Sequence, residues 1–243
     1  MPEIDVRKAQ IRERVWEALE ESGVARFPKP IRGRIPNFEG AAEAARLLSQ
    51  VDEFSSAKTI KVNPDSPQRP VRLLALSSGK KLIVPTPRLV AGFLLLDPKS
   101  IPRGLHSLAS TIAGAQQLGE SVSLASLPKV DLVVAGSVAV DRQGNRLGKG
   151  GGYSEIEYAV LAELGRVDDG TPIATTVHEL QIVGEVPVDA FDLQVDMVFT
   201  PKRVIRTTGD GRRPSGILWN LMNSEKVKSI PILQELRLLR QGR

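Results

Sequence analysis

Apolar residues recur along the chain with two different spacings, and each spacing predicts its own kind of element. Over residues 5–22, Ile11, Val15 and Leu19 lie on one helix face, so we predict an amphipathic helix there. Helical spacing predicts further helices over 39–52, 71–76 and 154–165. Short runs rich in β-branched and other apolar residues predict strands over 57–62, 81–84, 131–140, 172–177, 181–183, 197–200 and 204–207.

Proline and glycine mark the breaks between these elements. Three prolines within 26–38 predict a loop, and Asn-Pro-Asp-Ser-Pro over 63–67 is a strong turn signal. Strands that alternate with helices favour a parallel sheet covered by helices on both faces. We therefore predict an α/β fold, a three-layer sandwich with a mainly parallel sheet. Its ligands are expected above the carboxyl ends of the strands.

The composition excludes several classes of protein. With 243 residues, 41% hydrophobic and 25% charged, the chain resembles globular proteins rather than disordered ones. It has no cysteine, which excludes disulfides and cysteine nucleophiles, and two histidines argue against a multi-histidine metal site. No stretch approaches the roughly 20 apolar residues of a membrane span, and the N-terminus lacks the layout of a secretory signal. We expect a cytoplasmic protein with no membrane partner.

Positive charge is concentrated near the C-terminus. Residues 201–243 hold ten Lys and Arg against three acidic residues, whereas the whole chain has a net charge of +5. We therefore divide the chain into an α/β domain over 1–208 and a basic C-terminal extension over 209–243. Apolar residues at 217–219 and 230–233 predict that the extension packs partly on the core. The basic residues are either a solvated surface or a surface that attracts nucleic acid.

The densest glycine cluster lies in RLGKGGGYSEIE over 146–157, between a predicted buried strand and a predicted helix. In that setting backbone N–H groups and a helix N-terminus bind phosphate. Its four glycines allow the backbone to approach a ligand closely, and two cations flank them. The glycines are Gly148, Gly150, Gly151 and Gly152, and the cations are Arg146 and Lys149.

A second interpretation of this segment needs no ligand. Ser154 and Glu157 have the spacing of a capping box, so the cluster is alternatively a glycine-rich turn before a well-capped helix. The segment is neither a Walker loop, which has one more residue and a Ser or Thr after its Lys, nor a GxGxxG fingerprint.

The segment DRQGNRLGKGGGYSE over 141–155 resembles the signature of the 5-formyltetrahydrofolate cyclo-ligase family, D-x-x-G-x-RLGyGGGYYD. A later family pattern, Q…P…HD…vD…T, is similar to Gln181, Pro187, the pairs at 191–192 and 195–196, and Thr200. Lys8 and Arg12 match a Lys and an Arg that the family carries four residues apart on a helix. The resemblance covers roughly residues 5–206.

The resemblance implies an enzyme that uses ATP and Mg²⁺ to close 5-formyltetrahydrofolate, or a related one-carbon carrier, to a methenyl product. ATP would phosphorylate the formyl oxygen, the neighbouring nitrogen would attack, and phosphate would leave. The implied site comprises catalytic Arg146 and Lys149, nucleotide-binding Lys8, Arg12, Gly148, Gly150, Gly151, Gly152 and Tyr153, and a metal ligand, Glu155.

The chain departs from the family pattern at several positions. Ser154 replaces the second Tyr, Phe191 replaces the His, and Asp65 is the only acid in 63–72, where the family has a folate-binding carboxylate. These departures resemble a divergent branch of the family. Two other functions stay open: a non-catalytic nucleotide- or pterin-binding module, and an RNA-binding protein that uses the basic extension.

Two further residues carry alternative interpretations. Arg88 follows Pro-Thr-Pro at the end of a predicted strand, where it is either a ligand-binding cation or a surface residue on a stiff turn. His178 is either an acid–base group near the site or a structural histidine.

Overall fold

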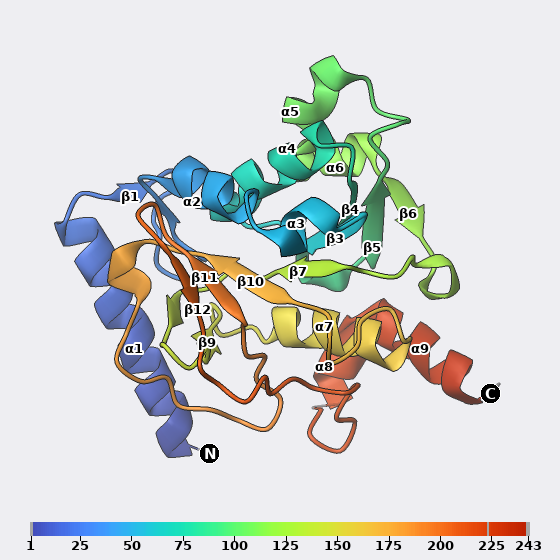
Figure 1. Ribbon diagram of the computed structural model, residues 1–243. Helices are drawn as coiled ribbons and strands as arrows, with labels where there is room; N and C mark the ends of the chain where they lie inside the picture. Colours follow the sequence, from blue (N-terminus) through green and yellow to red (C-terminus); the bar gives the residue numbers. More distant parts are fainter. Residues whose placement is uncertain (1, 223, 242–243) are drawn as a thin grey trace.

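The computed structural model describes residues 2–222 and 224–241, and an eight-stranded sheet forms its centre (Figure 1). The strand order is β12-β11-β10-β7-β3-β4-β5-β6. Five neighbouring strands are parallel: β3 (Thr59–Val62), β4 (Lys81–Pro85), β7 (Leu132–Val134), β10 (Ile173–Thr176) and β11 (Met197–Phe199). Antiparallel strands complete both edges: β5 (Phe93–Leu96), β6 (Glu120–Val122) and β12 (Val204–Arg206). The predicted mainly parallel sheet is confirmed.

Helices cover both faces of this sheet, as the predicted three layers require (Figure 1). One face packs against α2 (Ala41–Leu48), α3 (Asp52–Ser56), α4 (Arg69–Ser77), α5 (His106–Ala109) and α6 (Ile112–Leu118). The other face packs against α7 (Tyr153–Glu163), α8 (Ser224–Ser229) and α9 (Pro231–Gln241). Short 3-10 turns lie at η1 (Ser66–Gln68), η2 (Pro87–Leu89), η3 (Arg103–Leu105), η4 (Leu124–Ser126) and η5 (Glu179–Gln181).

The first helix, α1 (Pro2–Glu21), lies at one side of the molecule. Its apolar face contributes to a separate small core, in which Ile11, Val15 and Leu19 are buried. Two short antiparallel pairs complete that region, β1 (Ala25–Arg26) with β2 (Asn37–Phe38), and β8 (Ala139–Val140) with β9 (Arg146–Leu147). No helix in the described ranges is long and apolar enough to cross a membrane.

The apolar run over 131–140 is not the single strand that its composition predicts. β7 ends at Val134, and the chain leaves the main sheet before it pairs again as β8. The Gln181 side-chain amide donates hydrogen bonds to the carbonyl oxygens of Ser137 and Val138, at 2.9 and 3.1 Å. These bonds satisfy backbone acceptors where the ladder is interrupted, so the break stays buried.

Two other predicted elements also differ. The predicted strand over 181–183 is a 3-10 turn, η5, followed by an isolated bridge from Ile182 to Val140. The predicted helix over 39–52 is two helices, α2 and α3, separated at residues 49–51.

The segment after β12 lies against α7 rather than away from the fold (Figure 1). Ile230 and Leu233 are fully buried, and Ile217 and Val227 are nearly so. This contact brings a distant part of the chain beside the glycine cluster that begins α7.

A buried ion pair attaches α7 to the middle of the sheet. Ile60 and Val62 of β3 face the α2–α6 side, so Lys61 points to the opposite face, where its Nζ lies 2.5 Å from the Glu157 carboxylate. Lys61 also donates to Asn63 Oδ1 at 2.8 Å. Burial raises the pKa of Glu157, and the nearby Lys61 ammonium opposes that rise. The pair is costly to bury, but each charge is compensated by the other.

This arrangement overturns the capping-box interpretation of Ser154 and Glu157. α7 begins after Gly152, whose φ of 64° is left-handed, and no side chain caps the helix. Ser154 instead accepts a 2.8 Å hydrogen bond from Asn63 Nδ2, while Glu157 binds Lys61. Both side chains are used to attach the helix to β3.

We predict that Glu157→Leu lowers the free energy of unfolding by about 3–5 kcal/mol, because it leaves the Lys61 ammonium buried without a countercharge. Urea denaturation measures this loss. The double variant Lys61→Met/Glu157→Leu should lose clearly less than Glu157→Leu alone. A single variant as stable as the wild type would contradict this account of the pair.

Candidate functional site

The glycine loop, residues 148–152, lies between two clefts, one of which is at the carboxyl ends of β3 and β4. The strand-end cleft, about 410 Å³, is lined by 63–65, 86–88, Lys149 and the start of α7. The cation cleft, about 180 Å³, is lined by residues that include Lys8, Arg12, Arg146, Asp189, Phe191 and Asp192. Parallel α/β sheets bind ligands at this edge.

Backbone geometry explains why the loop is built from glycine. Gly150 and Gly152 have φ values of 101° and 64°, in the left-handed region that disfavours other residues. A Cβ on Gly151 would lie only 2.8 Å from the Tyr153 ring. Local backbone geometry and packing therefore favour glycine at positions 150, 151 and 152.

Two cations hold the carbonyl oxygens of the loop. Arg12 Nε donates to the Gly148 carbonyl at 2.7 Å, and Lys226 Nζ donates to the Gly151 carbonyl at 2.7 Å. Lys226 also lies 5.5 Å from the centre of the Tyr153 ring. Burial lowers the pKa of both Arg12 and Lys226.

The N–H groups of the same loop have no protein acceptor among the described residues. Within 2–222 and 224–241, the main-chain N–H groups of 148–152 donate no hydrogen bond to protein atoms. The first N–H groups of α7 follow directly and have no side-chain cap. With the carbonyls held by cations and the N–H groups unused, the loop has the electrostatics of an anion-binding site.

Arg146 lies beneath the loop and is 2% exposed. Its Nη1 donates to the Gly136 carbonyl at 2.6 Å, and its Nη2 pairs with Glu155. Its Nε is buried without a hydrogen-bond partner in the described structure. Arg146 thus positions Glu155, a carboxylate that lines both clefts.

The charge of Lys8 is compensated by two carboxylates, which the sequence does not predict. Its Nζ lies 2.8 Å from Asp189 and 2.5 Å from Asp192 and is almost completely buried. Burial lowers the pKa of Lys8, but hydrogen bonds to the two carboxylates more than compensate, so its pKa is raised. Asp192 also accepts a hydrogen bond from the Asp189 N–H at 2.8 Å. It therefore stabilises a turn and also lines the cation cleft.

Lys149 and Lys8 lie on opposite sides of the loop. Lys149 Nζ is 3.2 Å from Asp65 Oδ1 in the strand-end cleft. Each of the ten residues selected from the sequence lines one or both clefts. No group of three or more His, Asp or Glu residues in the described structure is arranged to hold a metal ion.

Lys226, Asn63 and Arg88 also lie at these clefts. Nothing local in the sequence indicates Lys226, because it meets the loop only through the packing of the C-terminal segment. Arg88 has a left-handed φ of 56°, as does Leu89, and Arg88 lines the strand-end cleft. Strained backbone of this kind often occurs at functional sites.

A family model for the 5-formyltetrahydrofolate cyclo-ligase family matches residues 4–201. This match spans most of the chain and includes the glycine loop. The chain belongs to the 5-formyltetrahydrofolate cyclo-ligase family.

The relatives of this cyclo-ligase family member include animal proteins. It is 46% identical over 237 residues to a methenyltetrahydrofolate synthase domain-containing protein of Mus musculus and 42% identical over 240 residues to one of Bos taurus. These matches cover 96% and 97% of this chain and 63% of each relative, so the chain spans about 63% of their length.

A solved structure has a similar fold. The NMR structure of Aquifex aeolicus 5,10-methenyltetrahydrofolate synthetase aligns with a TM-score of 0.52 and 22% identity. The alignment covers 83% of this chain and 93% of that one. The α/β fold is thus shared with a synthetase of that name.

His178 has a structural role in η5. Its Nδ1 accepts a hydrogen bond from the Leu180 N–H at 3.2 Å, and Gln181 Oε1 accepts from the His178 N–H at 2.7 Å. His178 lines neither cleft. Burial lowers its pKa below the ordinary 6.5.

We predict a pH-dependent stability term from His178. Because its pKa is lowered in the folded state, the unfolded state binds more protons below about pH 6.5, and stability falls as the pH decreases through that value. His178→Asn keeps a side-chain acceptor without titrating. The Tm of the wild type should therefore decrease more between about pH 7.5 and pH 5 than that of the variant. Equal decreases would refute the assignment.

Proposed function

We propose that this chain is an ATP- and Mg²⁺-dependent cyclo-ligase that closes 5-formyltetrahydrofolate, or a related formylated one-carbon carrier, to the methenyl product. Membership of the cyclo-ligase family and the names of the relatives support the reaction class. The observation that carries the proposal is the glycine loop, whose N–H groups lack acceptors within the described part of the chain while Arg12 and Lys226 bind two of its carbonyls.

The loop is suited to the polyphosphate of ATP. Unused N–H groups and the positive end of the α7 dipole both favour a bound anion. Arg12 is already fixed at the Gly148 carbonyl, on the side of the loop that faces the cation cleft. We assign the phosphates to this side, with Lys8 contributing through a network that Asp189 and Asp192 hold in place.

The one-carbon carrier is assigned to the strand-end cleft. This cleft is larger and contains hydrogen-bonding groups from Asn63, Asp65 and Glu157 beside apolar Ile35. The two clefts adjoin at the loop, because Gly148, Gly152 and Glu155 line both, so reactants bound in them would meet at this junction. Proximity of this kind lowers the entropic cost of bringing two substrates together.

The proposed reaction balances as two displacements. The formyl oxygen attacks the γ-phosphorus and ADP leaves. The neighbouring nitrogen then attacks the activated carbon, its N–H proton is released, and phosphate leaves. Negative charge develops on the transferring phosphoryl group and on the leaving phosphate. We assign the stabilisation of that charge to Lys149, which lines the strand-end cleft.

Glu155 is the residue we assign to Mg²⁺. It lines both clefts, and Arg146, whose Nε has no partner in the described structure, holds it from below. One carboxylate is sufficient for an ion that arrives with a nucleotide, since Mg²⁺ is commonly bound by one or two carboxylates together with phosphates and water. The ion would supply neutralising charge at the phosphates.

Turnover is tested by mixing the protein with ATP, Mg²⁺ and 5-formyltetrahydrofolate and following the methenyl absorbance. Lys149→Met should lower kcat by about 10²-fold or more, because it removes a charge beside the transferring group. Lys129→Met is the matched control. Lys129 also pairs with one aspartate at 3.2 Å on the surface, and it lines neither cleft, so this variant should keep full activity.

The outcomes separate the possible functions. No turnover together with no ATP binding would overturn the proposal. ATP binding without turnover of any folate would replace it with a non-catalytic nucleotide-binding module. Turnover that Lys149→Met leaves unchanged would refute the role given to Lys149.

A further inference from the structure

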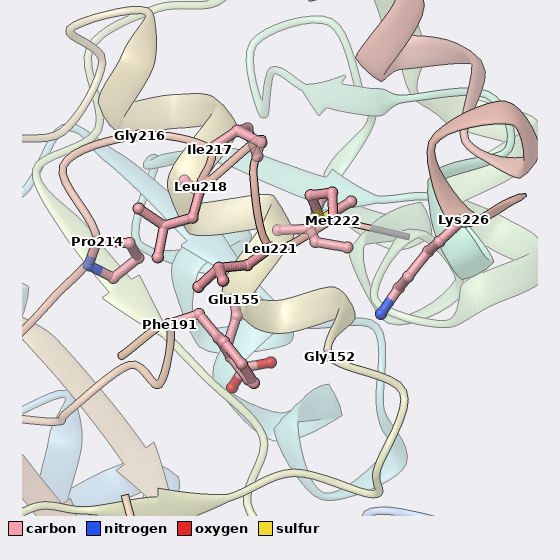
Figure 2. Close-up of a pocket in the computed structure, with 12 residues that line it drawn as sticks. Gly152, Glu155, Phe191, Pro214, Gly216, Ile217, Leu218, Leu221, Met222 and Lys226 are labelled. Atoms are coloured by element: carbon pink, nitrogen blue, oxygen red, sulfur yellow. The ribbon is translucent and has the colours of Figure 1, made fainter. Parts of the chain in front are cut away.

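A third cavity, about 250 Å³, lies beside the glycine loop between α7 and the C-terminal segment (Figure 2). Ile156 and Ala159 of α7 form one wall. The opposite wall comes from residues 214–222, including Leu218 and Leu221, and Phe191 completes the lining. Most of these side chains are apolar, and we call this cavity the apolar slot.

The apolar slot adjoins the cation cleft. Four residues line both cavities: Gly152, Glu155, Phe191 and Lys226. Figure 2 shows Lys226 reaching from α8 toward Gly152, in agreement with its hydrogen bond to the Gly151 carbonyl. An apolar space is therefore directly joined to a group of cations and unused N–H groups.

The C-terminal segment is firmly attached where it forms the slot. Arg213 donates to the Thr171 carbonyl at 2.6 Å and pairs with Asp196 at 2.8 Å. The Ile217 N–H donates to Glu163 at 2.9 Å. The slot is thus largely preformed, as small-molecule sites commonly are. This wall lies beyond residue 201, where the family match ends.

We propose that the apolar slot holds the nucleobase of the nucleotide whose phosphates lie on the glycine loop. The inference rests on the proposed function and extends it, since it assigns part of the nucleotide site to the C-terminal segment. A ligand that fits both cavities has a flat, weakly polar ring system joined to a polyanion. The slot is smaller than a site for a whole drug-sized ligand, about 300–1,000 Å³, and suits one ring system of it.

The residues that line the apolar slot also indicate how strongly it would discriminate between nucleobases. The charged side chains that line the slot are Glu155 and Lys226, and both lie at its junction with the cation cleft. The remaining lining residues carry no polar side chain to hydrogen-bond a base edge. An apolar pocket discriminates weakly between ligands of similar shape. We therefore expect ATP and GTP to bind with Kd values within about threefold of each other.

Isothermal titration calorimetry with ATP and with inorganic tripolyphosphate, both with Mg²⁺, tests the assignment. The wild type should bind ATP at least about tenfold more tightly, because tripolyphosphate lacks a base. Leu221→Asn should weaken ATP binding about fivefold and change tripolyphosphate binding less than about twofold.

Leu238→Asn is the control. Leu221 and Leu238 are 53% and 69% exposed, so both substitutions are compatible with folding, and Leu238 lies on α9 outside the slot. The control should bind both ligands as the wild type does.

Each other outcome overturns a defined part of the account. Equal affinities of the wild type for ATP and tripolyphosphate, or equal losses of both in Leu221→Asn, would refute the nucleobase assignment and leave the phosphate site standing. A Leu221→Asn effect on the KM for 5-formyltetrahydrofolate alone would assign the slot to the pterin instead. Failure of both phosphate ligands to bind would overturn the proposed function as well.

Discussion

The buried contact between Lys61 and Glu157 is the interaction on which the site depends. It fixes the N-terminal half of α7 against β3, and Asn63 extends the connection to Ser154 in the first turn. Since the glycine loop enters α7 directly, its position is set by this contact. Replacement of either charge by an apolar residue alone leaves the other uncompensated, so the attachment depends on both.

In the glycine loop the backbone carbonyl and N–H groups have different environments. Arg12 approaches from α1 and Lys226 from α8, and each accounts for one loop carbonyl. The N–H groups have no such partners within the described ranges. This asymmetry makes the loop a wall with positive electrostatic character between two clefts. Three distant parts of the chain, α1, the loop and the C-terminal segment, are needed to produce it.

The sequence was sufficient to predict the elements and motifs that depend on the local pattern of residues. Residue spacing placed the parallel strands and the helices α1, α2, α4 and α7, and the glycine motif indicated a segment that lines both clefts. The misinterpretations arose where a partner lies far away. The spacing of Ser154 and Glu157 predicted a capping box. In the structure Ser154 instead binds Asn63, just after β3, and Glu157 binds Lys61 of β3.

Similarly, nothing near residues 131–140 shows that the Gln181 side chain supplies hydrogen bonds where the strand ladder is interrupted. Composition alone therefore predicts one strand. Elements β5, β6, α5 and α6 went unpredicted; β6 is a three-residue edge strand, and α5 and α6 span few turns. Lys226 was missed because its role exists only once α8 packs beside α7.

The central claim is that the main-chain N–H groups of the glycine loop bind the polyphosphate of a nucleotide. The most direct measurement is a two-dimensional NMR titration of protein labelled with ¹⁵N-glycine, with ATP and Mg²⁺ added in steps. The account predicts large amide shifts for Gly150, Gly151 and Gly152 and none for Gly79 or Gly165, which line neither cleft. Unchanged loop amides at a concentration where ATP is bound would contradict it.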